Sequence, residues 1–185
     1  MSAILDVLSK RWSPRAFAPR AVEADKLQTL FEAARWAPSC YNDQPWHFVV
    51  TQRGIDASHE SLLACLMAAN QAWASTAPVL VLNCVRKNFS HNGKPNCWAF
   101  YDLGLAVGNL LSEATHQGLF VHQMAGFDAE LAHRALSLPA DHEAVAVMAL
   151  GYLGDPATLP AGVEEKSAAQ RERKAVSEIA HQGQW

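Results

Sequence analysis

The sequence predicts a single domain of the mixed α+β class. The chain has 185 residues, which suits one domain, and half of them are hydrophobic, which is enough for a sizeable core. Several segments carry apolar side chains at helical spacing, and short apolar runs of strand length lie between them. The chain contains neither an internal repeat nor a low-complexity tract that would divide it.

Two helices are predicted before the first strand. Residues 4–10 place apolar side chains at helical spacing, and this first helix is expected to end near residues 10–12. The two prolines of residues 11–20 prevent the helix from continuing. A second, amphipathic helix is predicted from Val22 to Trp36, with an apolar stripe made by Leu27, Leu30, Phe31 and Ala34.

The middle of the chain predicts two strands with a helix between them. Residues 46–51 form the first strand, and Gly54 ends it. A third helix is predicted in one piece from His59 to Ala74, because its leucines recur at helical spacing. Residues 78–85 form a near-continuous apolar run, which is typical of a central strand, and residues 86–96 are a polar loop.

The helix predicted from Trp98 to about Gln117 is apolar on nearly every side. Gly104 and Gly108 lie four residues apart and would let another backbone approach closely. A helix of this kind is expected to be buried all round, either in the centre of its own domain or between two subunits.

Two more strands and a polar tail complete the chain. Residues 119–124 and 144–153 predict strands, and Asp128 is expected to cap the short helix between them. From residue 157 onward the chain lacks the apolar density to fold alone. The tail is therefore either disordered or packed along something else, such as a partner subunit.

Composition argues against several classes of protein. The net charge of −3 disfavours a nucleic-acid binder. The four cysteines and eight histidines lack metal-site spacing, so we predict reduced thiols, no metal and a cytoplasmic location. The N-terminus does not resemble a signal peptide, and the most apolar segment, residues 98–111, is too short for a bilayer, so no membrane association is expected.

Two pairs of arginines are candidates for binding an anion. Arg11 and Arg15 flank Ser13 in one short loop, and Arg171 and Arg173 alternate in the tail. On an extended segment, side chains two residues apart point the same way. Two arginines with a hydroxyl between them suit a phosphate, although solvated surface charge is the alternative for either pair alone.

The segment A-P-S-C-Y-N-D-Q-P-W-H-F, residues 37–48, has more polar groups than a turn requires. The amides of Asn42 and Gln44 offer both donors and acceptors, which suits a heterocycle edge or a polyol, or else caps the loop's own backbone. Cys40 with His47 or His122 as base is a possible nucleophile, but a small loop thiol is the preferred interpretation. The chain carries no dinucleotide fingerprint, P-loop or nucleophile elbow.

The order of five segments resembles the FMN-dependent nitroreductase family. These segments are R-W-S-P-R, A-R-W-A-P-S-C-Y-N-D-Q-P-W-H-F-V-V, H-Q-M-A-G-F-D, G-Y-L-G-D-P and Q-R-E-R-K-A-V-S-E-I. The resemblance implies a nitroreductase-like fold with a central, mostly antiparallel four-stranded sheet flanked by helices. It also implies a homodimer in which the C-terminal tail, about residues 157–185 of a single 1–185 domain, is swapped onto the partner subunit.

The resemblance further implies an FMN site at the subunit interface. The phosphate and ribityl end would be held by Arg11, Ser13, Arg15, Arg171 and Arg173. The loop that reaches a flavin bound mainly by the other subunit would comprise Pro38, Ser39, Cys40, Asn42 and Gln44. Backbone from Met124, Ala125 and Gly126 would lie near flavin N5. Tyr41 and Trp98 are candidates for aromatic walls of the substrate slot, with ordinary packing as the alternative.

The implied function is an NAD(P)H oxidoreductase that reduces nitroaromatic, quinone or related small electron acceptors by a ping-pong mechanism. The flavin would supply the chemistry, so no protein side chain is assigned as catalytic. An enone reductase, a dehalogenase or a non-enzymatic flavin-binding protein of the same fold are the alternatives. The sequence does not distinguish NADH from NADPH as reductant.

Overall fold

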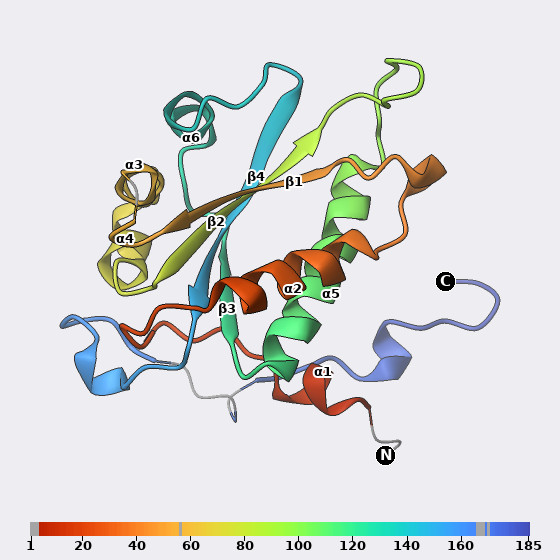
Figure 1. The fold of residues 1–185 in the computed structure, drawn as a ribbon. Helices are drawn as coiled ribbons and strands as arrows, with labels where there is room; N and C mark the ends of the chain where they lie inside the picture. Colours follow the sequence, from red (N-terminus) through yellow and green to blue (C-terminus); the bar gives the residue numbers. More distant parts are fainter. Residues whose placement is uncertain (1–3, 56, 166–168, 170) are drawn as a thin grey trace.

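In the computed structural model the domain is built on one four-stranded sheet in the order β1-β2-β4-β3 (Figure 1). The strands are β1 (Trp46–Gln52), β2 (Val79–Arg86), β3 (Phe120–Met124) and β4 (His142–Gly151). All three neighbouring pairs are antiparallel, which confirms the α+β prediction. The structure describes residues 4–55, 57–165, 169 and 171–185.

The apolar run of β2 explains its place in the middle of the sheet. Every residue of the strand except Arg86 is buried, because neighbouring strands cover both edges and helices cover both faces. All of β1 pairs with β2, from Trp46 opposite Val85 to Gln52 opposite Val79. The prediction of a central strand is confirmed.

Helices cover the sheet on both sides (Figure 1). On one face lie α2 (Ala24–Arg35) and the long α5 (Ala99–His116), with the short α1 (Asp6–Lys10) packed against α5. The other face carries α3 (Ser58–Ala64), α4 (Ala68–Ala74) and α6 (Ala129–Ala135). Asp128 caps α6 as predicted, accepting a 2.8 Å hydrogen bond from Leu131 N.

The single helix predicted from His59 to Ala74 is wrong, because the chain leaves the helical path at residues 65–67 and forms α3 and α4 instead. Asp128 N donates to Cys65 O at 2.8 Å, and Met67 N donates to Gly126 O at 2.9 Å. Between these bonds, Leu66 pairs with Phe127 as an isolated antiparallel bridge. The backbone groups that would continue the helix are therefore used to hold the segment that follows β3.

Helix α5 is not buried all round within one chain. Its inner side lies in the core, whereas Phe100 is 49% and Tyr101 64% exposed. A Cβ built on Gly104 or Gly108 would meet no atom within 4 Å, so the described part of the chain does not approach these glycines. The prediction that this helix is buried in the centre of its own domain is therefore wrong for its outer side. Among the described residues, no helix has the length and hydropathy needed to cross a membrane.

The predicted tail has two parts. Leu159 and Val163 pack against the domain's own core, so residues 157–165 belong to the body of the molecule. Residues 171–185 are exposed throughout, and Figure 1 shows this segment leading away from the sheet to the C-terminus. Residues 166–168 and 170 of the predicted tail lie outside the described residues.

Candidate functional site

Three predicted anion-binding arginines gather beside α1. Arg11 Nη1 donates to Ser13 Oγ at 3.3 Å. Arg171 Nη1 donates to the carbonyl of Arg11, and its Nη2 donates to Ser9 O at 2.7 Å. Burial, together with the positive charges of Arg171 and Arg173, lowers the pKa of the Arg11 guanidinium. The side chains thus form a cluster of like charges whose mutual repulsion an anion would relieve.

Arg15 stands slightly apart from this cluster and is tied to the first part of the tail. Its backbone N–H donates to both carboxylate oxygens of Glu165, at 2.8 and 3.0 Å, and its Nη1 donates to Glu164 O at 3.0 Å. On the other side, His122 Nδ1 donates to Pro14 O at 2.8 Å, which fastens the segment to β3. Burial lowers the pKa of His122, consistent with a neutral imidazole in this role.

The loop from Pro38 to Gln44, which we call the polar loop, has an unusual backbone. Tyr41, Asn42 and Gln44 all have positive φ values, of 55°, 54° and 49°. Non-glycine residues rarely adopt this conformation, and where they do, the surrounding structure must hold them. Inside the loop, Gln44 N donates to Ser39 Oγ at 3.0 Å and Gln44 Nε2 donates to Asn42 O at 3.2 Å.

The buried carboxylate of Asp43 anchors the polar loop to neighbouring segments. The Asp43 side chain is 1% exposed and forms an ion pair with Arg86 Nη2 at 2.9 Å. Its other oxygen accepts hydrogen bonds from Ser90 N at 2.8 Å and Ser90 Oγ at 2.6 Å. Burial opposes ionisation of Asp43, but the Ser90 hydrogen bonds and Arg86 outweigh it and lower the pKa. The loop is therefore fixed to the end of β2 and to the hairpin that follows.

A second buried carboxylate holds the loop from the side of α5. Asp102, which is 2% exposed, accepts a hydrogen bond from Cys40 N at 3.1 Å. Burial raises the pKa of the Cys40 thiol, and the nearby Asp102 raises it further, which disfavours a thiolate nucleophile. Cys40 and Asp102 line a cavity of about 320 Å³ together with Pro38, Ser39, Trp98, Tyr101 and Leu105.

The two aromatic candidates lie in different surroundings. Trp98 lines that cavity and lies edge-on to Tyr101, with ring centroids 6.4 Å apart. Tyr41 instead contacts the hairpin after β2, with its ring centroid 5.8 Å from that of Phe89 and 5.5 Å from that of His91. Trp98 and Tyr41 therefore do not pair as two walls of one slot within a single chain.

The segment Met124 to Gly126 is held by α4. Gly126 O accepts hydrogen bonds from Met67 N at 2.9 Å and from Asn70 Nδ2 at 3.0 Å. A Cβ on Gly126 would lie 2.8 Å from Asn70 Nδ2, so a larger residue would displace the Asn70 side chain from its hydrogen bond to Gly126 O. Asn70 was not identified from the sequence, because its partner lies 56 residues away.

Two of the three groups of predicted cofactor residues, the polar loop and the arginines, lie near opposite ends of α5. The polar loop is hydrogen-bonded to Asp102 in the first turn of α5. Helix α1, which precedes Arg11 in the chain, lies beside Glu113 and His116 in the last turns of α5. A helix of 18 residues is about 27 Å long. In Figure 1 the polar loop lies at the upper end of α5 and α1 at its lower end.

The chain was then compared with known proteins. The model of the nitroreductase family matches residues 8–152. The chain belongs to the nitroreductase family.

Relatives and a solved structure agree with this membership. An uncharacterised 15.4 kDa protein of Mycolicibacterium smegmatis is 36% identical over 136 residues, covering 72% of this chain and 90% of the relative. The oxygen-insensitive NAD(P)H nitroreductase of Salmonella typhimurium is 28% identical, covering 69% and 78%. A crystal structure of an oxidoreductase containing FMN superposes with a TM-score of 0.88 at 31% identity, covering 100% of this chain and 93% of the other.

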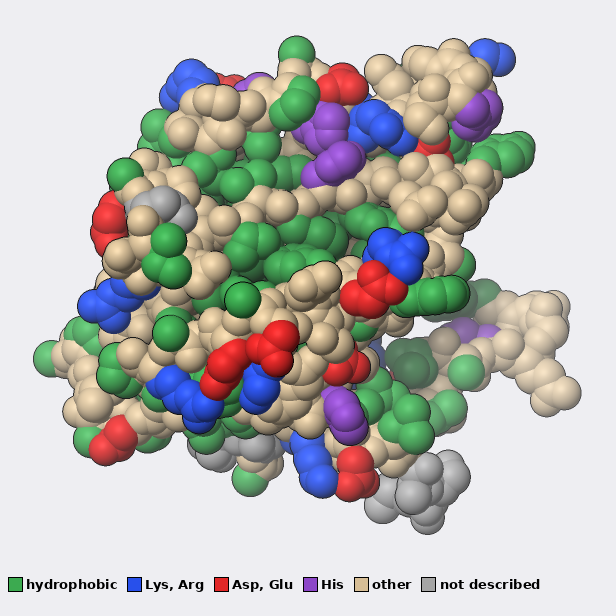
Figure 2. Space-filling model, viewed as in Figure 1, with side chains coloured by type: hydrophobic (Ala, Val, Ile, Leu, Met, Phe, Trp, Pro, Cys, Tyr) green, Lys and Arg blue, Asp and Glu red, His purple; other side chains and the backbone are tan. Residues whose placement is uncertain are grey.

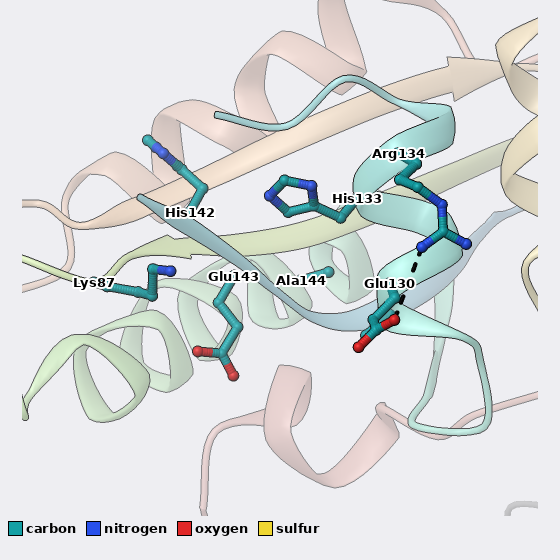
Figure 3. A pocket seen from close by; sticks show the side chains of 8 residues that line it. Lys87, Glu130, His133, Arg134, His142, Glu143 and Ala144 are labelled. Carbon is teal, nitrogen blue, oxygen red and sulfur yellow. Dashed lines mark ion pairs between the residues drawn. The ribbon is translucent and has the colours of Figure 1, made fainter. Parts of the chain in front are cut away.

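The protein also has a cavity that none of the predicted cofactor or substrate residues line. It measures about 280 Å³ and lies between α6 and the start of β4. Figure 3 shows His133 and Arg134 projecting from α6, with His142 and Glu143 on β4. His142 also pairs with His47 at a ring-centroid distance of 4.5 Å. Figure 2 shows histidine side chains gathered near the top of this face, above a band of hydrophobic ones.

Proposed function

We propose that the protein is an FMN-dependent NAD(P)H oxidoreductase that reduces nitroaromatic, quinone or related small electron acceptors. The observation that carries this proposal is the cluster of Arg11, Arg171 and Arg173 beside the Ser13 hydroxyl, in a chain of the nitroreductase family. Like charges held this close favour an anionic ligand, and the phosphate of FMN is such a ligand.

The remaining residues fit the rest of FMN. The amides of Asn42 and Gln44 would face its ribityl chain or ring, on a loop that Asp43 and Asp102 hold in one conformation. The backbone of residues 124–126, which Asn70 of α4 holds through Gly126 O, would lie against the isoalloxazine. When bound, the flavin supplies two-electron transfer, and the protein binds, orients and shields it.

We further propose that two copies of the chain complete each site. The polar loop and the arginine cluster lie near opposite ends of α5, so each would meet the complementary group of a partner. The exposed outer side of α5, with Phe100, Gly104 and Gly108, would form the dimer core. The tail carries Val176 and Ile179, 74% and 67% exposed, which a partner would cover.

One open cavity would serve both substrates. The reductant would occupy it first and leave as the oxidised nicotinamide before the acceptor enters, which gives ping-pong kinetics. No side chain of the site is required to transfer a proton for this scheme, which is consistent with a site made mostly of amides, arginines and backbone groups.

The visible spectrum of the purified protein, before and after anaerobic addition of NADPH or NADH, tests the proposal. We expect flavin bands near about 370 and 450 nm that bleach with at least one nicotinamide. Bands that persist with both would make the protein a flavin binder without this activity. A protein that stays colourless after incubation with FMN would contradict the assignment of the site.

A further inference from the structure

We propose that Tyr41, Phe89 and His91, here called the aromatic tip, form a wall of the acceptor site and select flat aromatic electron acceptors. This inference rests on the proposed flavin function. The three rings form a closed set, with centroids 5.8 Å apart for Tyr41 and Phe89, 5.5 Å for Tyr41 and His91, and 5.3 Å for Phe89 and His91.

The aromatic tip joins two segments that are distant in the sequence. Tyr41 belongs to the polar loop, and the other two rings belong to the hairpin of residues 87–96. In that hairpin, Asn88 bridges to Pro95, and Phe89 N donates to Lys94 O at 2.8 Å. Residues 86–96, after β2, were expected to be an irregular polar segment. They instead fold into a hairpin that places aromatic rings next to the polar loop of residues 38–44.

Asp43 fixes the position of the two segments relative to each other. It follows Tyr41 by two residues, and it binds Ser90, which lies between Phe89 and His91. Arg86 completes the link, because it donates to Asp43 and also, through Nε, to Asn88 O at 3.1 Å. A change in the polar loop is therefore transmitted directly to the hairpin, which makes Asp43 a positioning residue for the aromatic tip.

The rings of the aromatic tip are held in place by their neighbours and are accessible to a ligand. Tyr41 is 81% exposed, and its backbone is in the left-handed region, which non-glycine residues rarely adopt. The Asn92 amide, whose oxygen accepts from Lys94 N at 2.8 Å, directs its nitrogen to His91 Nε2 at 2.9 Å. Tyr41 and His91 are exposed and Phe89 is half-buried, so rings held beside the polar loop would bind a flat aromatic partner through stacked or edge-on contacts.

The chemistry of the tip distinguishes acceptor classes. A naphthoquinone or nitroaromatic ring offers a flat, electron-poor π-face that can stack on the rings of the tip, whereas a small enone without an aromatic ring does not. Loss of two of the rings should therefore weaken binding of a naphthoquinone and have little effect on cyclohexenone.

The test uses the double variant Tyr41→Leu/Phe89→Leu, with Ile55→Ala as the control at a surface position that is 71% exposed and lies outside the tip. The single variant Phe89→Leu is measured beside them, since it leaves the polar loop intact. For each protein, the dissociation constant of 1,4-naphthoquinone is measured from the flavin spectrum without reductant. KM and kcat are then measured for 1,4-naphthoquinone and 2-cyclohexenone.

For the double variant, we expect the dissociation constant and the KM of naphthoquinone to rise about tenfold. For Phe89→Leu alone, we expect both constants to rise about threefold. For Phe89→Leu, which leaves the polar loop unchanged, the flavin content, the bleaching by NAD(P)H and the KM of cyclohexenone should match those of the control. Unchanged naphthoquinone binding in flavin-loaded variants, or an equal loss for cyclohexenone, would overturn the inference while leaving the proposed function intact. A wild-type protein that binds no flavin would overturn both.

Discussion

The arginine cluster and the polar loop are the two halves of the candidate site, and they are built in opposite ways. Around Arg11 the charges repel one another, and backbone carbonyls hold Arg171 in place. In the polar loop the strained residues are held by buried carboxylates that have their own partners, Asp43 on Arg86 and Asp102 on Cys40 N. The first half contains like charges that an anion would stabilise, and the second half is held by paired carboxylates.

This difference predicts that changes in the two halves have different consequences. A change in the polar loop should reduce the stability of the fold, because partners there are buried and cannot be replaced by water. A change in the arginine cluster should reduce ligand affinity and leave the fold intact, because the side chains are partly solvated and repel one another.

The largest effect is expected for Asp43→Ala. It leaves Arg86 and Ser90 without their shared partner, and removal of one member of a buried ion pair should lower the free energy of unfolding by about 3 kcal/mol. Urea denaturation of wild type and variant measures this loss. Glu130→Ala is the matched control, because its ion pair with Arg134 is long, at 3.8 Å, and 91% exposed on the Glu130 side. A loss for Asp43→Ala no larger than for this control would contradict the claim that the Asp43 contacts to Arg86 and Ser90 stabilise the fold.

Arg11→Ala should have the converse result. Removing a charge-assisted contact to the phosphate should weaken FMN binding by about ten- to a hundredfold. Thermal stability of the flavin-free protein should be unchanged or slightly higher, because repulsion with Arg171 and Arg173 is relieved. Titration of flavin-free protein with FMN, followed by fluorescence, gives the affinity.

Arg134→Ala serves as the control for Arg11→Ala, since Arg134 lies on α6 and its side chain is 66% exposed. Equal FMN affinity in the two variants would remove Arg11 from the site. A large fall in stability for Arg11→Ala would instead assign the residue to the fold.

The smallest expected effect is a loss, at low pH, of the stabilisation that the ionised Asp43 side chain provides. The pKa of Asp43 lies below its ordinary value of 3.8, so its ionised form stabilises the folded state. That contribution is fully present above about pH 4 and is lost as the pH falls through the lowered pKa. The difference in unfolding free energy between wild type and Asp43→Asn should therefore shrink below about pH 4. A difference that stays constant down to pH 2 would show that ionisation of Asp43 is not involved.

Local pattern in the sequence was sufficient for much of the fold. The apolar run of β2, the stripe of α2 and the Asp128 cap all act through neighbouring residues, and the structure confirms them. The break between α3 and α4 was missed, because it is made by hydrogen bonds to residues 126–128, which helical spacing does not report. Leucines at the right spacing favoured a helix, and tertiary hydrogen bonds overrode that preference.

The same limit applies to the site. The arginines and the amides could be identified because their residue types and spacing are themselves the signal. The supporting residues could not: Asp43 and Asp102 act through partners 43 to 62 residues away, and Asn70 reaches Gly126 across the chain. The aromatic tip was missed for the same reason, since Phe89 and His91 meet Tyr41 only after the hairpin folds.

The central claim is that each site combines the arginine cluster of one chain with the polar loop of another, and mixing two defective chains tests it most directly. One chain carries Arg11→Ala/Arg171→Ala and the other Ser39→Ala/Asn42→Ala, and each alone should retain little FMN. After unfolding and refolding together, half of the dimers are mixed, and each mixed dimer regains one intact site. The account predicts flavin binding at about a quarter of all sites. Flavin content no higher than that of the separate variants would contradict a shared site.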